Sequence, residues 1–186
     1  MKIERDHGLF IYAASPPNDT GWAVLPGVAW MPSWMTERPD WYREKARVHE
    51  RVHWWRQQID AVAGGAVIVG LVSLIAGVDV GWNTLLWTVV GAAAGLFAWY
   101  LRYGVSPSFR LDVEVEAEAA EKAHLIEDGR WHPTAENIAE YAISHLDNYY
   151  GRFPLFGSPP AYADVRSRFR RALAAEGVDL RAEEIR

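Results

Sequence analysis

The sequence of 186 residues contains no cysteine. This absence excludes disulfide frameworks, iron–sulfur clusters, cysteine-based zinc fingers and thiol nucleophiles. Basic residues are not in excess either, because 19 Lys and Arg stand against 24 Asp and Glu and give a net charge of −5. Binding to a phosphate backbone depends on clustered cations that release counterions, so we expect no nucleic-acid partner. Motifs of serine hydrolases (G-x-S-x-G) and of P-loop nucleotide sites are also absent.

Charge is almost missing from the middle of the chain. No charged residue occurs at positions 61–78 or 80–101, and Asp79 alone separates these two runs. A helix of about 20 apolar residues is long enough to cross a hydrocarbon core of ~30 Å. Because the connector around Asp79 is short, the runs predict a helical hairpin whose two ends lie on one side. The hairpin is expected either in membrane lipid or inside a large protein assembly, since an apolar helix must be covered by one of them.

The residues around and within the hairpin predict its orientation and its packing. Basic residues gather at its open ends, so by the positive-inside bias the ends lie in the cytoplasm and Asp79 on the far side. The alternative location is a virion or another large assembly. Gly91 and Gly95 form a G-x-x-x-G pattern, and Ala66 with Gly70 offers a small-residue partner on the first helix. We expect the two helices to cross closely at these positions.

A mainly α-helical fold is expected, in five consecutive regions. Residues 1–39 are rich in Trp and Pro and predict loops with short strands. Residues 40–60 predict a polar helix that continues into the hairpin of residues 61–101. Residues 102–150 predict two more polar helices, the first beginning at Ser106-Pro and ending at Gly129. Residues 151–186 predict a Pro-rich linker and a basic helix.

The polar helix before the hairpin contains the sequence H-E-x-x-H, formed by His49, Glu50 and His53. Residues four apart lie one turn apart on the same face of a helix, so both imidazoles can reach one Zn²⁺ ion at ~2.0–2.1 Å. Glu50 projects beside the ion, where a carboxylate can accept a proton from zinc-bound water. The pattern therefore predicts a zinc site with Glu50 as general base. The alternative is an amphipathic surface helix in which Glu50 pairs with Arg47 or Arg51.

A hydrolytic zinc site needs a third protein ligand and an open fourth position. No further histidine follows at a suitable spacing, but the helix after the hairpin carries Glu114, Glu116 and Glu118. The hairpin returns the chain to the side it left, so this helix can lie against the first. Glu114 and Glu118 share a face, whereas Glu116 points about 200° away. If the shared face meets the motif helix, Glu114 binds the metal and Glu118 can orient a ligand histidine. At this point Glu114, Glu116 and Glu118 all stay open as the third ligand, as does a purely solvated acidic helix.

The order H-E-x-x-H, two-helix hairpin, E-x-x-A-[D/E] resembles the membrane gluzincins, zinc metallopeptidases of the HtpX and CAAX-protease type. The residues that match their second motif are Arg110, Glu114, Ala117 and Glu118. The resemblance implies His49, His53 and Glu114 as zinc ligands and Glu50 as the base. It covers roughly residues 40–125. The chain departs from the family in its Trp-rich N-terminal region, which replaces membrane helices, and in having Glu118 where the family has Asp.

Two functions follow from these patterns. The first is a zinc metallopeptidase that cleaves a peptide or protein substrate near a membrane. The second is a structural protein, such as a phage virion or envelope component, whose metal site is structural or vestigial. A fourth protein ligand would indicate the second function, and the candidates for it are His124, His132 and Asp112. For the peptidase, residues 21–30 could form an edge strand that pairs with an extended substrate, and the candidates for stabilising the oxyanion are His124, His132, His145, Tyr149 and Tyr150.

Overall fold

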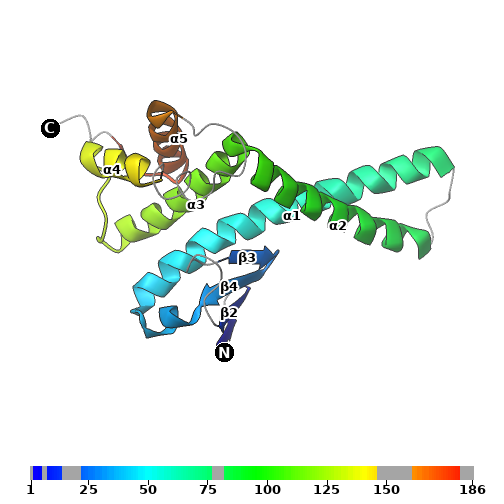
Figure 1. Ribbon diagram of the computed structural model, residues 1–186, viewed down its shortest axis with the longest axis horizontal. Helices are drawn as coiled ribbons and strands as arrows, with labels where there is room; N and C mark the ends of the chain where they lie inside the picture. Colours follow the sequence, from blue (N-terminus) through cyan, green and yellow to red (C-terminus); the bar gives the residue numbers. More distant parts are fainter. Residues whose placement is uncertain (1, 6–7, 14–21, 77–81, 146–160, 181–186) are drawn as a thin grey trace.

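The computed structural model describes residues 2–5, 8–13, 22–76, 82–145 and 161–180. The strands are β1 (Lys2–Arg5), β2 (Leu9–Ala13), β3 (Trp22–Leu25) and β4 (Val28–Pro32), followed by the short 3₁₀ helix η2 (Ser33–Glu37). The helices are α1 (Asp40–Ala76), α2 (Trp82–Val105), α3 (Pro107–Glu127), α4 (Ala135–His145) and α5 (Tyr162–Ala175). The fold is mainly helical, as the sequence predicts. Helix α1 lies between the small sheet and the group formed by α3, α4 and α5 (Figure 1).

The four strands form one sheet in the order β1-β2-β4-β3. Strands β2 and β4 are parallel, and the other two pairs are antiparallel. Side chains alternate along β2 and β4, so that one face of the sheet packs on α1. The shared core consists of Phe10, Tyr12, Ala29, Met31, Met35 and Trp54. Trp54 follows the H-E-x-x-H motif directly, and its ring lies 4.8 Å from that of Phe10, so the sheet packs one residue beyond His53.

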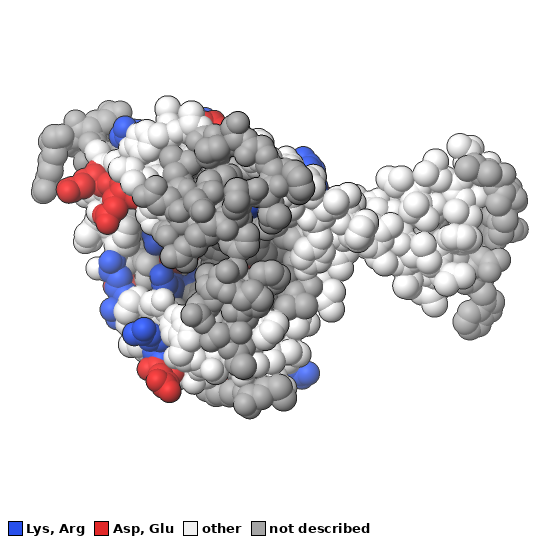
Figure 2. Space-filling view, viewed as in Figure 1, with Lys and Arg blue, Asp and Glu red and all other residues white. Residues whose placement is uncertain are grey.

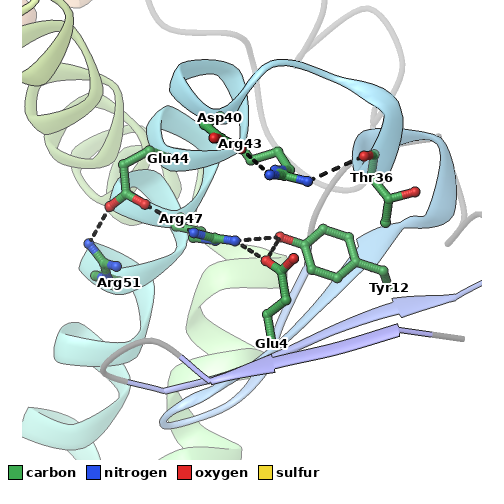
Figure 3. Close-up of polar contacts among 8 residues, drawn as sticks. All are labelled: Glu4, Tyr12, Thr36, Asp40, Arg43, Glu44, Arg47 and Arg51. Atoms are coloured by element: carbon green, nitrogen blue, oxygen red, sulfur yellow. Dashed lines mark hydrogen bonds and ion pairs between the residues drawn. The ribbon is translucent and has the colours of Figure 1, made fainter.

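Polar contacts also join the sheet to the first turns of α1 (Figure 3). The Arg47 guanidinium donates to Glu4 of β1 and to the Tyr12 hydroxyl of β2, the latter at 3.3 Å. Arg47 and Arg51 also both bond Glu44, at 3.2 and 3.0 Å. The bonds from Arg47 to Glu4 and Tyr12 join α1 to the sheet, so they help to fix the rotation of the helix and the direction in which the motif faces.

Helix α1 runs without interruption for 37 residues, which corresponds to about 55 Å. Its first half carries the polar motif and its second half the first apolar run. The predicted regions 40–60 and 61–101 are therefore joined, because α1 continues from the first into the second. Since no break interrupts the helix between the motif and the first apolar run, the direction of the hairpin relative to the motif is fixed.

Helices α1 and α2 cross at four glycines. A Cβ atom placed on Gly95 would lie 2.3 Å from the Asp60 carbonyl oxygen, and one on Gly91 would lie 2.7 Å from the Gly65 Cα. The predicted contact at Gly91 and Gly95 is thus confirmed, since only glycine permits so close an approach. The predicted partner pair was wrong: the facing glycines are Gly64 and Gly65, while a Cβ on Gly70 would contact nothing within 4 Å.

The hairpin projects from the rest of the molecule as an apolar rod (Figures 1 and 2). On the face shown in Figure 2, no charged residue is visible among the described residues of this projection. Both α1 and α2 are long and apolar enough to cross a membrane. Only 11% of the most apolar stretch of α1 is buried, and only 17% of that of α2. The large exposed side chains include Val62, Val67, Leu71, Leu74, Leu85, Leu86, Val89 and Phe97. The hairpin is therefore not the core of this chain.

Helix α3 has two buried faces of opposite character. Leu111, Val115 and Ala119 pack against α4 and α5, in a core completed by Ile138, Ala142, Val165, Phe169 and Leu173. The other face turns Glu114 and Glu121 toward α1. Ser106 caps the N-terminus by accepting a hydrogen bond from the Phe109 amide, and Gly129 follows the C-terminus at a φ of 66°. Both predicted ends of this helix are confirmed.

Candidate metal centre

Three side chains from two helices converge where α3 crosses the first half of α1. The Nε2 atoms of His49 and His53 lie 3.2 Å apart. The Glu114 oxygens lie 3.6 Å from each of them, Oε2 from His49 and Oε1 from His53. The structure therefore brings together the two histidines and the carboxylate that the sequence favoured, and this group could hold a metal ion.

The separations between these atoms match the requirements of a small divalent cation. Ligands at ~2.1 Å from a tetrahedral zinc ion are about 3.4 Å from one another. The two Nε2 atoms are 3.2 Å apart, and each has one oxygen of Glu114 at 3.6 Å, Oε2 beside His49 and Oε1 beside His53. These values lie close to that figure. Both imidazoles present the same nitrogen, Nε2, to the shared centre. A cation could thus be held with little movement of His49, His53 or Glu114.

The centre is largely removed from solvent. Glu114 is 1% exposed, Glu50 is 5% exposed and His53 is 6% exposed. Burial by itself raises the pKa of the Glu114 carboxyl, but the charge of the neighbouring imidazoles and the hydrogen bonds from His49 and Tyr103 outweigh this effect. The pKa is held well below its usual range, so Glu114 is a carboxylate at neutral pH. An ionised ligand in a buried position favours a cation beside it.

The two histidines carry one proton between them when no cation is bound. Burial lowers the pKa of His49, but the hydrogen bond to Glu114 and the charge of Glu118 outweigh burial and raise it to about 10. Burial lowers the pKa of His53 to about 4, a change that the adjacent charge of His49 supports. At neutral pH the group therefore consists of an imidazolium, an imidazole and a carboxylate. A divalent cation would replace the proton on His49.

A second group of carboxylates lies on the other side of the His49 ring. Its Nδ1 atom is 3.7 Å from Glu121 Oε2, and Glu118 belongs to the same cluster. Lys45 Nζ and Lys122 Nζ each lie 3.1 Å from Glu121 Oε1. These ammonium groups lower the pKa of Glu121 against the opposing effect of its burial, whereas burial and Glu121 raise that of Glu118. Lys45 and Lys122 therefore favour the ionised form of Glu121, the carboxylate 3.7 Å from the His49 ring.

The remaining acidic candidates point elsewhere. Glu116 bonds Arg56, with Nε at 2.6 Å from Oε2, on a different face of α3. Asp112 bonds Arg168 of α5. Within the described ranges, the groups able to hold a metal include neither Asp112 nor His124 nor His132. The predicted fourth-ligand candidates thus do not complete the centre in this part of the chain.

Sequence reasoning missed one polar neighbour of the centre. Tyr103, in the last turn of α2, donates its hydroxyl hydrogen bond to Glu114 Oε1. No spacing rule connects a residue at the end of an apolar helix with one on the next helix. The contact between Tyr103 and Glu114 depends on how α2 packs against α3, which the sequence does not specify. Among the oxyanion candidates, Tyr149 and Tyr150 lie outside the described residues, as does the side chain of His145.

The prediction of one edge strand over residues 21–30 was wrong in its extent, because the chain turns at Gly27 and forms two strands there. Only β3 (Trp22–Leu25) lies at an edge of the described sheet, whereas β4 lies between β2 and β3. Strand β3 also contacts α1, the helix that carries the motif. The strand therefore lies at an edge where its backbone could pair with another extended segment.

Comparisons with models of protein families, with curated proteins and with solved structures found no match. The resemblance to membrane gluzincins consequently stays a prediction carried by the motif residues.

Proposed function

We propose that the protein is a zinc-dependent metallopeptidase anchored to a membrane by its apolar hairpin. The observation that carries the proposal is the convergence of the His49 and His53 Nε2 atoms, 3.2 Å apart, on the Glu114 carboxylate, which has one oxygen 3.6 Å from each of them. Two histidines and one glutamate are a common protein contribution to a hydrolytic zinc site, which keeps its fourth position for water.

Glu50 supplies the proton acceptor in this proposal. It follows His49 on α1 and is 5% exposed. A bound zinc ion would supply a water molecule whose pKa is lowered to about 7. Glu50 would accept the proton of that water and would return it to the leaving amine. Edge strand β3 offers the backbone groups that would hold an extended substrate.

The hairpin supports a membrane location. Leu74 is 82% exposed, Val62 72% and Phe97 69%. Exposing many large apolar side chains to water on one surface is unfavourable, and such surfaces commonly contact lipid or another protein. Motif residue His53 precedes the apolar run at residue 61 by eight positions, or about 12 Å along α1. The proposed substrates are therefore peptide segments close to a membrane surface, on the cytoplasmic side by the distribution of basic residues.

Substitution of the base tests the catalytic proposal. Glu50→Gln is nearly isosteric but cannot accept the proton, so it should retain zinc and fold while hydrolysis falls by at least about 100-fold. The assay is cleavage of casein and of a peptide that carries an apolar anchor, with the zinc-loaded protein in detergent and with a chelator as control. A zinc-loaded wild type that cleaves neither substrate, and matches Glu50→Gln in every property, would favour a structural metal site and an assembly role for the hairpin.

A further inference from the structure

Tyr103 occupies a position that joins the hairpin to the metal centre. It lies two residues beyond Leu101, the end of the second apolar run, and still within α2. Its hydroxyl donates to Oε1 of Glu114, a residue on the next helix. Its ring stands edge-on to that of His53, with centroids 6.3 Å apart and an interplanar angle of 80°. One side chain in the last turn of α2, just beyond the hairpin, thus contacts two of the three proposed ligands.

The ring of Tyr103 is held from its own helix. Trp99, one turn earlier in α2, stacks on it with centroids 5.1 Å apart and planes inclined by 15°. Trp99 is itself only 4% exposed. A tyrosine between a buried stacked ring and an edge-on imidazole has few rotamers available, so the hydroxyl is presented to Glu114 in a fixed direction.

Arg110 fixes the corner between the two helices. It lies one turn before Glu114 on α3 and is 5% exposed. Its Nε atom donates to the Tyr103 carbonyl at 3.2 Å, and its Nη2 atom donates to the Gly104 carbonyl at 3.3 Å. These bonds satisfy carbonyls at the end of α2, where a helix leaves acceptors unpaired. The helix that carries the ligand carboxylate therefore also holds the backbone of Tyr103.

The bond selects between the two oxygens of Glu114. Oε1 accepts from the hydroxyl and lies 3.6 Å from His53 Nε2, while Oε2 receives no bond from the hydroxyl and lies 3.6 Å from His49 Nε2. A carboxylate with one oxygen committed to a donor presents the other to a cation, and such outer hydrogen bonds orient a ligand and hold it ready. Without the hydroxyl, Glu114 could rotate about its terminal torsion and offer either oxygen.

We propose that Tyr103 is a positioning residue of the metal centre, which holds Glu114 in its ligating orientation. The geometry of the metal site then depends on how α2 packs against α3. The inference rests on the proposed zinc centre but not on peptide hydrolysis. It assigns to the hairpin a second role beyond anchoring, because α2 delivers the hydroxyl that orders a ligand on α3.

The test compares Tyr103→Phe with Tyr42→Phe, which makes the same change at a ring of α1 that contacts Trp34 and Trp41 instead of the centre. Zinc affinity is measured on the full chain in detergent by competition with a chromophoric chelator. The visible absorption spectrum of the Co²⁺-loaded protein reports ligand geometry independently of affinity. Circular dichroism verifies that the helices are retained.

Tyr103→Phe should weaken zinc binding by about tenfold, at the lower end of the effect of outer-ligand changes. It should also shift the Co²⁺ absorption bands, whereas Tyr42→Phe should change neither. Equal affinity and an unchanged spectrum in Tyr103→Phe would overturn the positioning role while leaving the zinc centre intact. A wild type that binds no zinc would overturn both proposals. A zinc-binding wild type without hydrolysis, with the expected Tyr103→Phe effects, would remove only the peptidase.

Discussion

At the scale of single residues, the centre is governed by charge in a buried space. Glu114 and Glu50 are both nearly inaccessible to water, and each lies next to a histidine of the motif. A buried carboxylate is expensive unless a positive charge accompanies it. In the metal-free chain that charge is the proton on His49, and a zinc ion would supply it more strongly. In the proposed zinc centre, a cation would therefore take the place of the proton on His49.

This exchange predicts a definite proton count. The pKa of His49 is raised to about 10 and that of His53 is lowered to about 4. At pH 7 only His49 is protonated, so binding of one zinc ion should displace one proton from the ligands. Because protons compete with the metal, affinity should rise about tenfold per pH unit as pH increases from 6 to 8. Calorimetry in buffers of different ionisation enthalpy measures the count; the release of two ligand protons, or of none, would contradict the assignment.

At the scale of elements, the crossing of α1 and α2 sets the position of the whole hairpin. A Cβ on Gly95 would lie 2.3 Å from the Asp60 carbonyl, which is rigid backbone and cannot give way. The same atom on Gly70 would meet nothing within 4 Å. The two glycines therefore differ sharply in what they contribute, although both are small residues in an apolar helix.

Gly95→Ala should force the helices apart and destabilise the protein by about 1–3 kcal/mol, the usual range for overpacking. Gly70→Ala should be neutral or stabilising by up to about 1 kcal/mol, because alanine is the better helix former. Thermal unfolding of both variants in one detergent provides the comparison. Equal midpoints for the two variants would show that the close crossing is absent.

The elements were predictable from sequence to different degrees. The charge-free runs and the H-E-x-x-H spacing are local patterns, so the hairpin, the polar helix and the shared face of His49 and His53 could be anticipated. Helical periodicity separated Glu114 from Glu116, and the resemblance to the gluzincin motif favoured Glu114; the structure places Glu116 against Arg56 instead. The four-stranded sheet, the facing pair Gly64 and Gly65, and the hydroxyl of Tyr103 depend on how distant segments meet, which no local period specifies.

At the scale of the whole molecule, a charged globular part and an apolar rod are joined by one continuous helix (Figures 1 and 2). Helix α1 carries His49 and His53 in its first half and exposed residues such as Val67 in its second. A bilayer would cover the rod and place the centre near the membrane surface. A protein assembly would cover the same rod by contact with partner side chains.

A charge placed on the rod separates these environments. Val89 is 59% exposed on α2, and an arginine near the centre of a spanning helix costs about 2.5–3.5 kcal/mol. Val89→Arg should therefore reduce the fraction of protein that floats with lipid vesicles. Leu25→Arg, at a position 48% exposed on β3, is the matched control and should float like the wild type. A wild type that stays dissolved without detergent and does not float would indicate an assembly instead.

The metal content of the purified protein tests the central claim most directly. Elemental analysis of wild type prepared without added metal should give one zinc per chain, and Glu114→Gln should lose it because the amide is a far weaker ligand. Glu116→Gln is the control on the same helix, and it should keep full zinc because Glu116 bonds Arg56. Zinc absent from the wild type, or retained equally in Glu114→Gln and Glu116→Gln, would contradict a centre built from His49, His53 and Glu114.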